Sequence, residues 1–463
     1  MSKFNTKYIF TISMVSAMGG LLFGYDWVVI GGAKPFYELF FSISDSANLQ
    51  GWAMSCALVG CLLGAMASGM LSDKYGRKKL LLFAALLFTL SAIGTGACNE
   101  YNMFVFYRIL GGIGIGLASN LSPIYIAEIS PASMRGKFVS LNQLTIVIGI
   151  LAAQLVNWGI ADFVPPGTSP EEILHSWNGQ TGWRWMFWAE AIPATLFFLL
   201  MLTVPESPRW LAQKNHKDKV LKILSKIGGK QYAEQEYNSI CQNTASKVSK
   251  TNFRSLLKPN MRKVLIIGIT LAAFQQWCGI NVIFNYAQEI FEAAGYDVSD
   301  ILFNIVITGT VNLIFTFVAI YTVDKLGRRT LMLIGAGGLT VIYLFIGLSY
   351  FFNITGWILL LLVISAIACY AMSLAPVTWV ILSEIFPNRI RAAAMGVATV
   401  SLWLASFLLT YTFPFLNKWL NASGTFWLYG GICMAGLLFI FRNLPETKGR
   451  SLEEIESELV TEK

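Results

Sequence analysis

Charged side chains are scarce in this chain of 463 residues. Asp, Glu, Lys and Arg together make up 13% of it, whereas hydrophobic residues make up 55%. In soluble domains about a quarter of the residues are charged, so this deficit excludes an ordinary soluble fold. The composition indicates a membrane protein.

Histidine and paired cysteines are equally scarce. The two histidines, His175 and His216, fall between apolar segments, so neither a histidine-based triad nor a metal cluster is expected. The seven cysteines lie mainly within apolar segments and form no C-x-x-C pair, which predicts neither a disulfide framework nor a metal site. The phosphate-binding pattern G-x-x-x-x-G-K-[ST] is absent too. We therefore expect a protein that is not an enzyme and needs no cofactor other than a coupling ion.

Apolar segments long enough to cross a bilayer recur along the chain. A helix needs about 20 such residues to span the hydrocarbon core. Twelve windows qualify, near residues 8–33, 50–72, 79–98, 102–127, 137–161, 184–204, 263–290, 301–323, 330–352, 356–382, 390–416 and 424–444. The first is too long for a signal-peptide core and should remain a helix. The predicted fold class is an all-α membrane protein with twelve transmembrane helices.

The net charge of +8 could suggest nucleic acid, but its placement favours a lipid bilayer. Lys and Arg gather in alternate loops, including 74–79, 209–263 and 325–329, whereas the loops between are nearly free of them. Such basic loops remain in the cytoplasm. We therefore expect a monomeric, multi-pass protein of the cell (inner) membrane that has both termini in the cytoplasm and binds no nucleic acid.

Three loop patterns occur twice in the same order, about 240 to 256 residues apart, which is the spacing of two half-transporters. The copies are Asp73-Lys74-Tyr75-Gly76-Arg77 and Asp324-Lys325-Leu326-Gly327-Arg328; Glu128-Ile129-Ser130-Pro131 and Glu384-Ile385-Phe386-Pro387; Pro205-Glu206-Ser207 and Pro445-Glu446-Thr447. The repeats predict two parallel six-helix halves, 1–205 and 261–445, a cytoplasmic helical linker, 206–260, and a cytoplasmic tail, 446–463.

One apolar window contains an unusual group of amides. Gln275, Gln276 and Asn281 lie between about Val264 and Ile290, at positions that a regular helix cannot aim at one small object. Gly279 could unwind the helix locally, as happens where transporter helices line a cavity. The stretch therefore favours a binding site for a neutral, hydroxyl-rich solute. The alternative is that the amides join neighbouring helices.

Three further residues are candidates for the same site. Gln143 lies near the start of the fifth helix, and Asn312 stands alone in an apolar helix. Pro376 interrupts the tenth helix close to Trp379, whose indole suits the C–H face of a sugar ring. Each of them could equally serve helix packing.

Three ionisable residues, Asp26, Arg108 and Glu190, are predicted at one depth near the outer surface. Buried charges at such a depth are usually paired or functional, and breaking a pair could move a proton. The alternative is that all three extend to the interface.

The glycines from Gly111 to Gly116, shortly after Arg108, resemble a dinucleotide-binding loop but lack the strand that would precede it. We therefore interpret Gly112 and Gly116, like Gly60 and Gly64, as sites of close helix packing.

The paired D-x-x-G-R-[RK] loops, the run Pro205 to Leu211 and the run Pro445 to Arg450 together resemble the sugar porter family of the major facilitator superfamily over essentially the whole chain. The segments Tyr107 to Gly112 and Gly182 to Trp185 are most similar to its bacterial proton-coupled members. The resemblance implies sugar binding by Gln143, Gln275, Gln276, Asn281, Asn312 and Trp379. It also implies that Asp26, with Arg108 and Glu190, couples transport to protons.

The hypothesis is a proton-coupled symporter that imports a monosaccharide by alternating access, with an uncoupled sugar uniporter as the alternative. Ion pairs would latch the cytoplasmic side; their members are Asp73, Arg77, Glu128, Arg135, Asp324, Arg328, Glu384 and Arg391. Ile150 departs from the pattern of the xylose carriers, and Asn285, Ala375 and Leu402 depart from the pattern of the family. D-xylose and a hexose such as D-glucose are therefore both retained as candidate substrates. A sugar receptor is disfavoured because the tail after Pro445 is too short for a signalling domain.

Overall fold

The computed structural model of the protein describes residues 4–246, 259–354, 356–387, 390–448 and 450. Over these residues every regular element is a helix, as predicted. In chain order they are α1 (Thr6–Phe40), α2 (Ala47–Tyr75), α3 (Arg77–Ala97), α4 (Tyr101–Ile129), α5 (Arg135–Ile160), α6 (Pro170–His175), η1 (Asn178–Gly182), α7 (Trp183–Thr203), α8 (Pro208–Gln213), α9 (Lys217–Ser246), α10 (Pro259–Trp277), α11 (Ile280–Asn285), α12 (Ala287–Glu292), α13 (Val298–Leu326), α14 (Arg328–Phe351), α15 (Trp357–Met372), α16 (Leu374–Ile385) and α17 (Arg391–Asn443).

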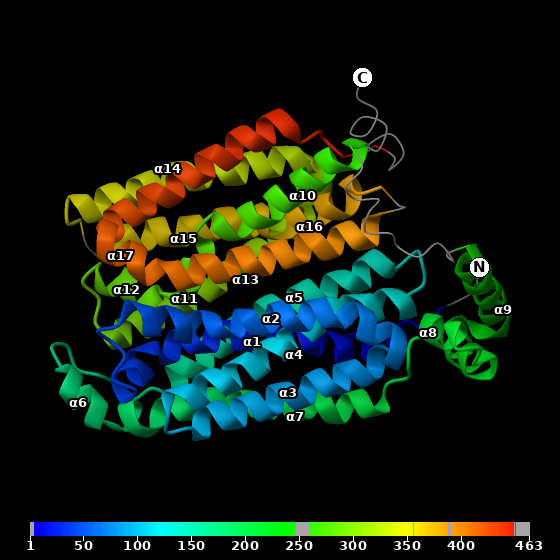
Figure 1. Cartoon of the computed structure of the whole chain (residues 1–463), viewed down its shortest axis with the longest axis horizontal. Coiled ribbons are helices and arrows are strands. Elements are labelled where there is room, and N and C mark those ends of the chain that lie inside the picture. Colours follow the sequence, from blue (N-terminus) through cyan, green and yellow to red (C-terminus); the bar gives the residue numbers. More distant parts are fainter. Residues whose placement is uncertain (1–3, 247–258, 355, 388–389, 449, 451–463) are drawn as a thin grey trace.

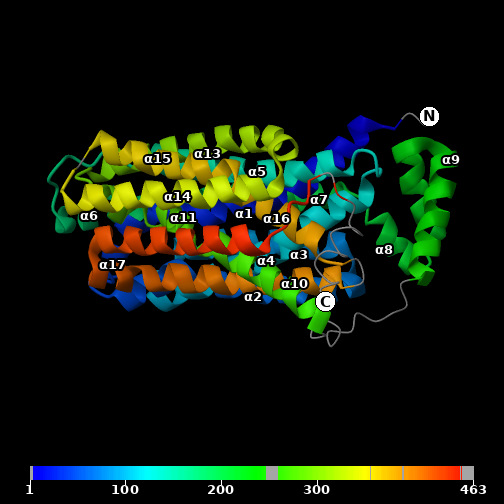
Figure 2. The ribbon, with the colours of Figure 1, turned by 90° about the horizontal axis from the view of Figure 1, so that it is seen from above.

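Eleven helical stretches of the described chain are long and apolar enough to span a membrane. The last of them belongs to α17, whose 53 residues would extend about 80 Å as one rod, far beyond one bilayer. Asn421 interrupts it with non-helical angles, φ 58° and ψ 177°. There α17 turns back on itself (Figure 2), so it crosses twice and the predicted twelve crossings are confirmed.

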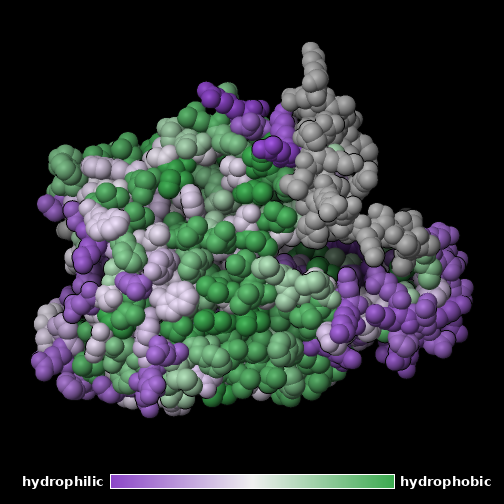
Figure 3. Space-filling model, viewed as in Figure 1, coloured by the Kyte–Doolittle hydropathy of each residue, from purple (hydrophilic) through white to green (hydrophobic). Residues whose placement is uncertain are grey.

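The membrane helices form two bundles that lie side by side, with α1–α7 in one and α10–α17 in the other (Figure 1). The helices α8 and α9 lie at one end of the molecule, here called the α9 end, and the short helix α6 lies at the opposite end, here called the α6 end. Hydrophobic residues cover the surface between these ends, and hydrophilic residues gather at both (Figure 3). The domain boundaries at 205, 260 and 445 stay predictions.

Small residues bring α2 and α4 into close contact. A Cβ atom on Gly112 would lie 1.9 Å from the carbonyl oxygen of Ala57, and one on Gly60 would lie 2.2 Å from a carbonyl oxygen of α4. Gly64 and Gly116 make similar approaches. Only glycine fits at these points, which confirms the prediction of helix packing.

The linker helices pack against the α9 end of the first bundle. Gly228 and Gly229 break α9, so its first part matches the predicted helix near residues 218–227. Val220 and Leu224 are buried in a small apolar cluster with Ile9 of α1. The linker is therefore attached to the helix that opens the chain.

Candidate functional site

The helix that carries the buried amides is broken at the predicted glycine. Gly279 has φ +86°, a left-handed conformation, and separates α10 from α11. A Cβ atom there would lie 2.8 Å from the ring of Tyr429. Both the backbone angle and the neighbouring ring therefore require glycine. The prediction that Gly279 unwinds the helix is confirmed.

The break lets three amides meet. The Nε2 of Gln276 donates to the Oε1 of Gln275 at 2.7 Å, and the Nδ2 of Asn281 donates to the Oε1 of Gln276. The three side chains are at most 8% exposed. All three belong to α10 and α11, so these two bonds do not join separate transmembrane helices. Each amide has two donor hydrogens and an acceptor oxygen, so the chain keeps hydrogen-bonding capacity for a ligand.

A second break interrupts the tenth crossing. Here α15 ends at Met372 and α16 begins at Leu374, two residues before Pro376. Proline lacks an N–H and its ring clashes with the carbonyl four residues earlier, which is that of Met372. The predicted kink is therefore present, and Trp379 follows it, partly buried on α16.

The remaining substrate candidates lie on separate helices. Gln143 is partly buried on α5, and Asn312 is 6% exposed on α13. Among the described side chains, no hydrogen bond links Gln143, Asn312 or Trp379 to the three amides of α10 and α11. Their role in substrate binding stays a prediction.

The predicted charge pair is present inside the first bundle. Arg108 of α4 donates through Nη1 to the Oδ1 of Asp26 on α1, and through Nη2 to the Asp26 backbone oxygen at 3.2 Å. The two side chains are 2% and 1% exposed, which is inconsistent with their reaching the interface. Glu190 of α7 is also buried, and its Oε1 has no hydrogen-bond partner in the described part of the chain. Its role in proton coupling stays a prediction.

A small pocket joins this charge pair to the second bundle. Arg108 and Trp27 line it from the first bundle, and Asn285 lines it from the second. The Trp27 ring lies 6.0 Å, centroid to centroid, from that of Trp403 on α17. We did not assign Trp27 a role from the sequence. The one sequence feature that could have indicated a role for Trp27 is its place directly after Asp26.

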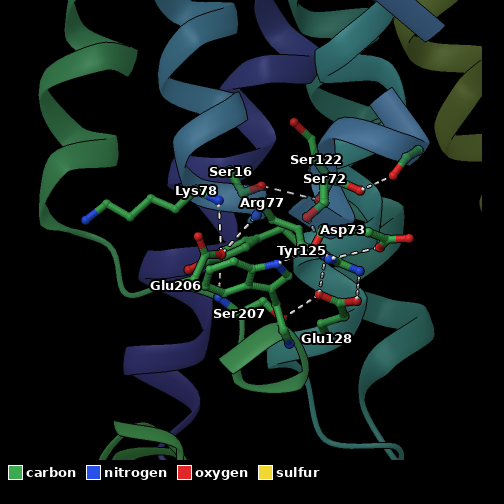
Figure 4. Close-up of polar contacts among 12 residues, drawn as sticks. Ser16, Ser72, Asp73, Arg77, Lys78, Ser122, Tyr125, Glu128, Glu206 and Ser207 are labelled. Atoms are coloured by element: carbon green, nitrogen blue, oxygen red, sulfur yellow. Dashed lines mark hydrogen bonds and ion pairs between the residues drawn. The ribbon is translucent and has the colours of Figure 1, made fainter. Parts of the chain in front are cut away.

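The first-half copies of the repeated loop patterns meet beside the start of α8 (Figure 4). The Nε of Arg77 lies 3.0 Å from Glu128, and its Nη1 lies 3.5 Å from Asp73. The hydroxyl of Ser207 also donates to Glu128. Segments far apart in the chain therefore form one polar cluster, which accounts for their recurring together.

Glu206 completes this cluster, and its role could not be recognised from its place in the sequence. Its Oε1 accepts the backbone N–H groups of Arg77 and Lys78 at 3.0 and 3.1 Å, at the start of α3. The first N–H groups of a helix have no partner within it, and an acid is favoured there. Gly76, with φ +93°, leaves the space that the carboxylate needs, since a Cβ would lie 2.2 Å from Glu206.

The second half repeats this arrangement. Glu446 accepts the N–H groups of Arg328 and Arg329 at 2.9 and 3.1 Å, beside Gly327, which also has φ +93°. Partial burial raises the pKa of Glu446, but the backbone N–H donors, that of Lys448 among them, outweigh it and lower the pKa. The two halves are thus alike in atomic detail.

The other latch candidates give a mixed result. Arg328 lies 3.4 Å from Glu384, as its counterpart Arg77 lies beside Glu128. Arg135 donates instead to the backbone oxygen of Ala127 at 3.1 Å, because it opens α5 directly after the loop that follows α4. The side chains of Asp324 and Arg391 lie outside the described part of the structure. The pairs that are described stay within one half, so a latching role stays a prediction.

The described side-chain contacts between the two bundles gather towards the α6 end. Tyr411 of α17 donates to Asn48, in the first turn of α2, at 2.6 Å. The N–H of Val164, in the loop after α5, donates to Ser299 of α13 at 2.9 Å. The Trp158 and Phe303 rings lie 5.9 Å apart. The two bundles are therefore joined at this end.

Two helical bundles with a largely hydrophobic outer surface, broken helices and buried polar groups near their interface define a membrane transport protein. The chain belongs to the sugar (and other) transporter family, whose model matches residues 12–459. This confirms the resemblance seen in the repeated loops.

Individual relatives match over nearly the full chain. The D-xylose-proton symporter of Escherichia coli (strain K12) is 40% identical over 486 residues, covering 98% of this chain and 96% of the relative. The arabinose-proton symporter of Bacillus subtilis (strain 168) is 39% identical, covering 97% and 94%. The inward-open structure of the E. coli xylose transporter has a TM-score of 0.84 and 38% identity, covering 98% of this chain and all of that one.

Proposed function

We propose that the protein is a proton-coupled symporter that imports a monosaccharide by alternating access. The observation that carries the proposal is the chain of buried amides at the Gly279 break. Amides offer donors and acceptors without net charge, which suits the hydroxyl groups of a neutral sugar. Two relatives that are named proton symporters for pentoses support the same substrate class.

Proton coupling is assigned to Asp26, with Arg108 as its partner and Glu190 nearby. A buried carboxylate paired with a guanidinium is stable only while the pair is intact, because separation leaves an uncompensated charge. Protonation of Asp26 removes that charge and releases Arg108. The binding of a proton thereby allows the two halves to rock against each other once sugar is bound.

The distribution of basic loops supports an orientation with the α9 end and both termini in the cytoplasm and the α6 end outside. The contacts between the bundles at the α6 end then correspond to a closed outer side. The likeness to an inward-open structure supports this assignment. The transporter is proposed to act as a monomer in the inner membrane.

Both a pentose and a hexose remain candidates for the substrate. Ile150 and Leu402 offer no hydrogen bond where the xylose carriers resembled by this chain have amides, and an unpaired buried hydroxyl costs about 1–3 kcal/mol. The loss of two amides therefore changes which hydroxyl groups are satisfied. D-xylose and D-glucose are the first sugars to compare.

The test is proton movement in proteoliposomes. Adding sugar outside vesicles without an ion gradient should acidify the lumen, and competition by xylose, glucose, galactose and fructose should rank the substrates. Sugar uptake without acidification would support a uniporter, in which Asp26 and Arg108 are a structural pair. Absence of binding for all four sugars would contradict the proposed substrate class.

A further inference from the structure

Lys34 forms a buried ion cluster that no motif predicted. It lies towards the α6 end of α1, and its side chain is 1% exposed. Its Nζ lies 3.0 Å from the Oε1 of Glu38, one turn further along α1, and contacts the Oε1 of Glu289 on α12. Glu38 belongs to the first bundle and Glu289 to the second. The cluster is therefore an ion bridge across the interface.

Neighbouring groups from both bundles enclose the cluster. Gln50 of α2 donates to the Oε2 of Glu38 at 3.2 Å. On the other side, the Lys34 Nζ lies 5.6 Å from the ring centroid of Tyr286, whose hydroxyl donates to the Thr410 backbone oxygen of α17 at 2.7 Å. The three charges are thus held in one fixed arrangement by segments of both halves.

Separation of the bundles would affect the two carboxylates differently. Glu38 lies on the same helix as Lys34, so this pair can remain when the halves part. The contact with Glu289 must break, because that residue moves with the second half. The Lys34–Glu289 bond therefore forms only when the α6 end is closed, and opening leaves the carboxylate of Glu289, whose side chain is 23% exposed in this closed arrangement, without its lysine.

We propose that Lys34 and Glu289 form the outer gate of the transporter and stabilise the state that opens inward. This inference rests on the proposed function, because that function assigns the α6 end to the outer side of the membrane. It assigns Lys34 a positioning role: the residue need not touch sugar, but it sets the fraction of molecules whose outer side is open. A ligand or bond that favours one of two states shifts their populations by its differential energy.

The test measures that population directly. Ile30 is buried, lines the pocket beside Arg108 and lies one turn before Lys34, so Ile30→Cys reports opening of the outer side. Intact cells that make this variant are treated with a membrane-impermeant maleimide, and labelling of the same chain without the new cysteine is subtracted. Glu289→Gln and Lys34→Met should each raise the labelling rate at least about fivefold.

Matched variants separate the gate from a general loss of stability. Glu38→Gln removes the same charge from the same lysine within one half, so it should leave labelling near the Ile30→Cys level. Glu292→Gln, three residues along the chain from Glu289 and exposed, should do the same. Lys34→Arg should keep labelling low, because the bridge to Glu289 is retained.

Unchanged labelling in Glu289→Gln would overturn the gate, as would an equal rise in Glu38→Gln. If Lys34→Met fails to fold, the comparison of Glu289→Gln with Glu38→Gln still decides. The labelling needs no sugar, so its result is independent of the sugar and proton measurements. A failure of the proposed function would instead appear as absent sugar binding in the unaltered protein.

Discussion

The charges of Asp26 and Arg108 must remain compensated throughout the transport cycle. Both side chains are buried, and the pair takes two hydrogen bonds from the guanidinium, one of them to the backbone of Asp26. Removing one partner of a buried pair costs about 3–5 kcal/mol because the other charge is left behind. A neutral partner of the same shape is therefore the informative replacement.

We expect Asp26→Asn to lose proton-driven accumulation and to retain exchange of sugar. The amide oxygen can still accept from Arg108, but it cannot gain or lose a proton at neutral pH. Accumulation against a gradient in vesicles should fall to the level of simple equilibration, whereas counterflow exchange should persist. Accumulation equal to that of the unaltered protein would contradict the coupling role.

Gln276 is the centre of the amide chain, since it donates to Gln275 and accepts from Asn281. We expect Gln276→Leu to weaken sugar binding by about 10- to 100-fold, because unpaired buried polar groups cost roughly 1–3 kcal/mol. Equilibrium binding measured by tryptophan fluorescence would show the change. Gln235→Leu, at an exposed position of α9, is the control and should bind as the unaltered protein does.

At the scale of one element, the break between α10 and α11 depends on Gly279. We expect Gly279→Ala to lower stability, because a left-handed conformation costs a residue with a Cβ about 1–2 kcal/mol and the new atom would meet the Tyr429 ring. The amides of α10 and α11 should also shift, which would weaken sugar binding. Thermal unfolding in detergent tests the first effect.

Gly431→Ala is the matched control for that element. Gly431 lies within α17 and would place a Cβ in open space, so alanine should be tolerated there. Equal melting temperatures for the two variants would show that the break does not depend on the glycine.

The start of α14 offers a test of pH dependence. The backbone donors hold the pKa of Glu446 below its ordinary value of 4.5, despite partial burial, which acts in the opposite direction. Because the folded-state pKa is lowered, its contribution to stability is present above 4.5 and is lost as the pH falls through the lowered value. Glu446→Gln should therefore melt at a lower temperature at neutral pH, and the difference should shrink in acid. A constant difference across this range would argue against a charge effect.

At the scale of the whole molecule, coupling predicts a limit on accumulation. A membrane potential of about 100 mV supplies ~2.3 kcal/mol per charge, and one pH unit supplies ~1.4 kcal/mol. One proton per sugar would then support roughly 500-fold accumulation. Uptake into energised vesicles should approach this ratio and collapse when a protonophore is added.

Much of this architecture could be predicted from the sequence. Apolar windows located the membrane crossings, and the repeated order of three loop patterns within the chain indicated the duplication. The break at Gly279 was predictable because glycine is the residue that lets a helix unwind where neighbouring amides converge. Asp26 and Arg108 were predictable because charges in apolar windows need partners.

The features that escaped prediction depend on contacts between distant segments. Glu206 lies in the loop after α7, and the sequence of that loop does not show that the carboxylate contacts the start of α3. Lys34 and Glu38 directly follow the first apolar window, so they resembled ordinary charged residues at the membrane surface. Only the arrangement of α12 against α1 shows that Glu289 completes a cluster. Periodicity describes one helix at a time, whereas these contacts join several.

The two glycine–glutamate junctions, Gly76 with Glu206 and Gly327 with Glu446, give this chain an internal standard. Each junction ties the end of one membrane crossing to the beginning of another within its own half, with nearly the same geometry. Equivalent substitutions at the two places can therefore be compared inside one molecule. A difference in transport rate between two equivalent substitutions would show that the two halves contribute unequally to transport.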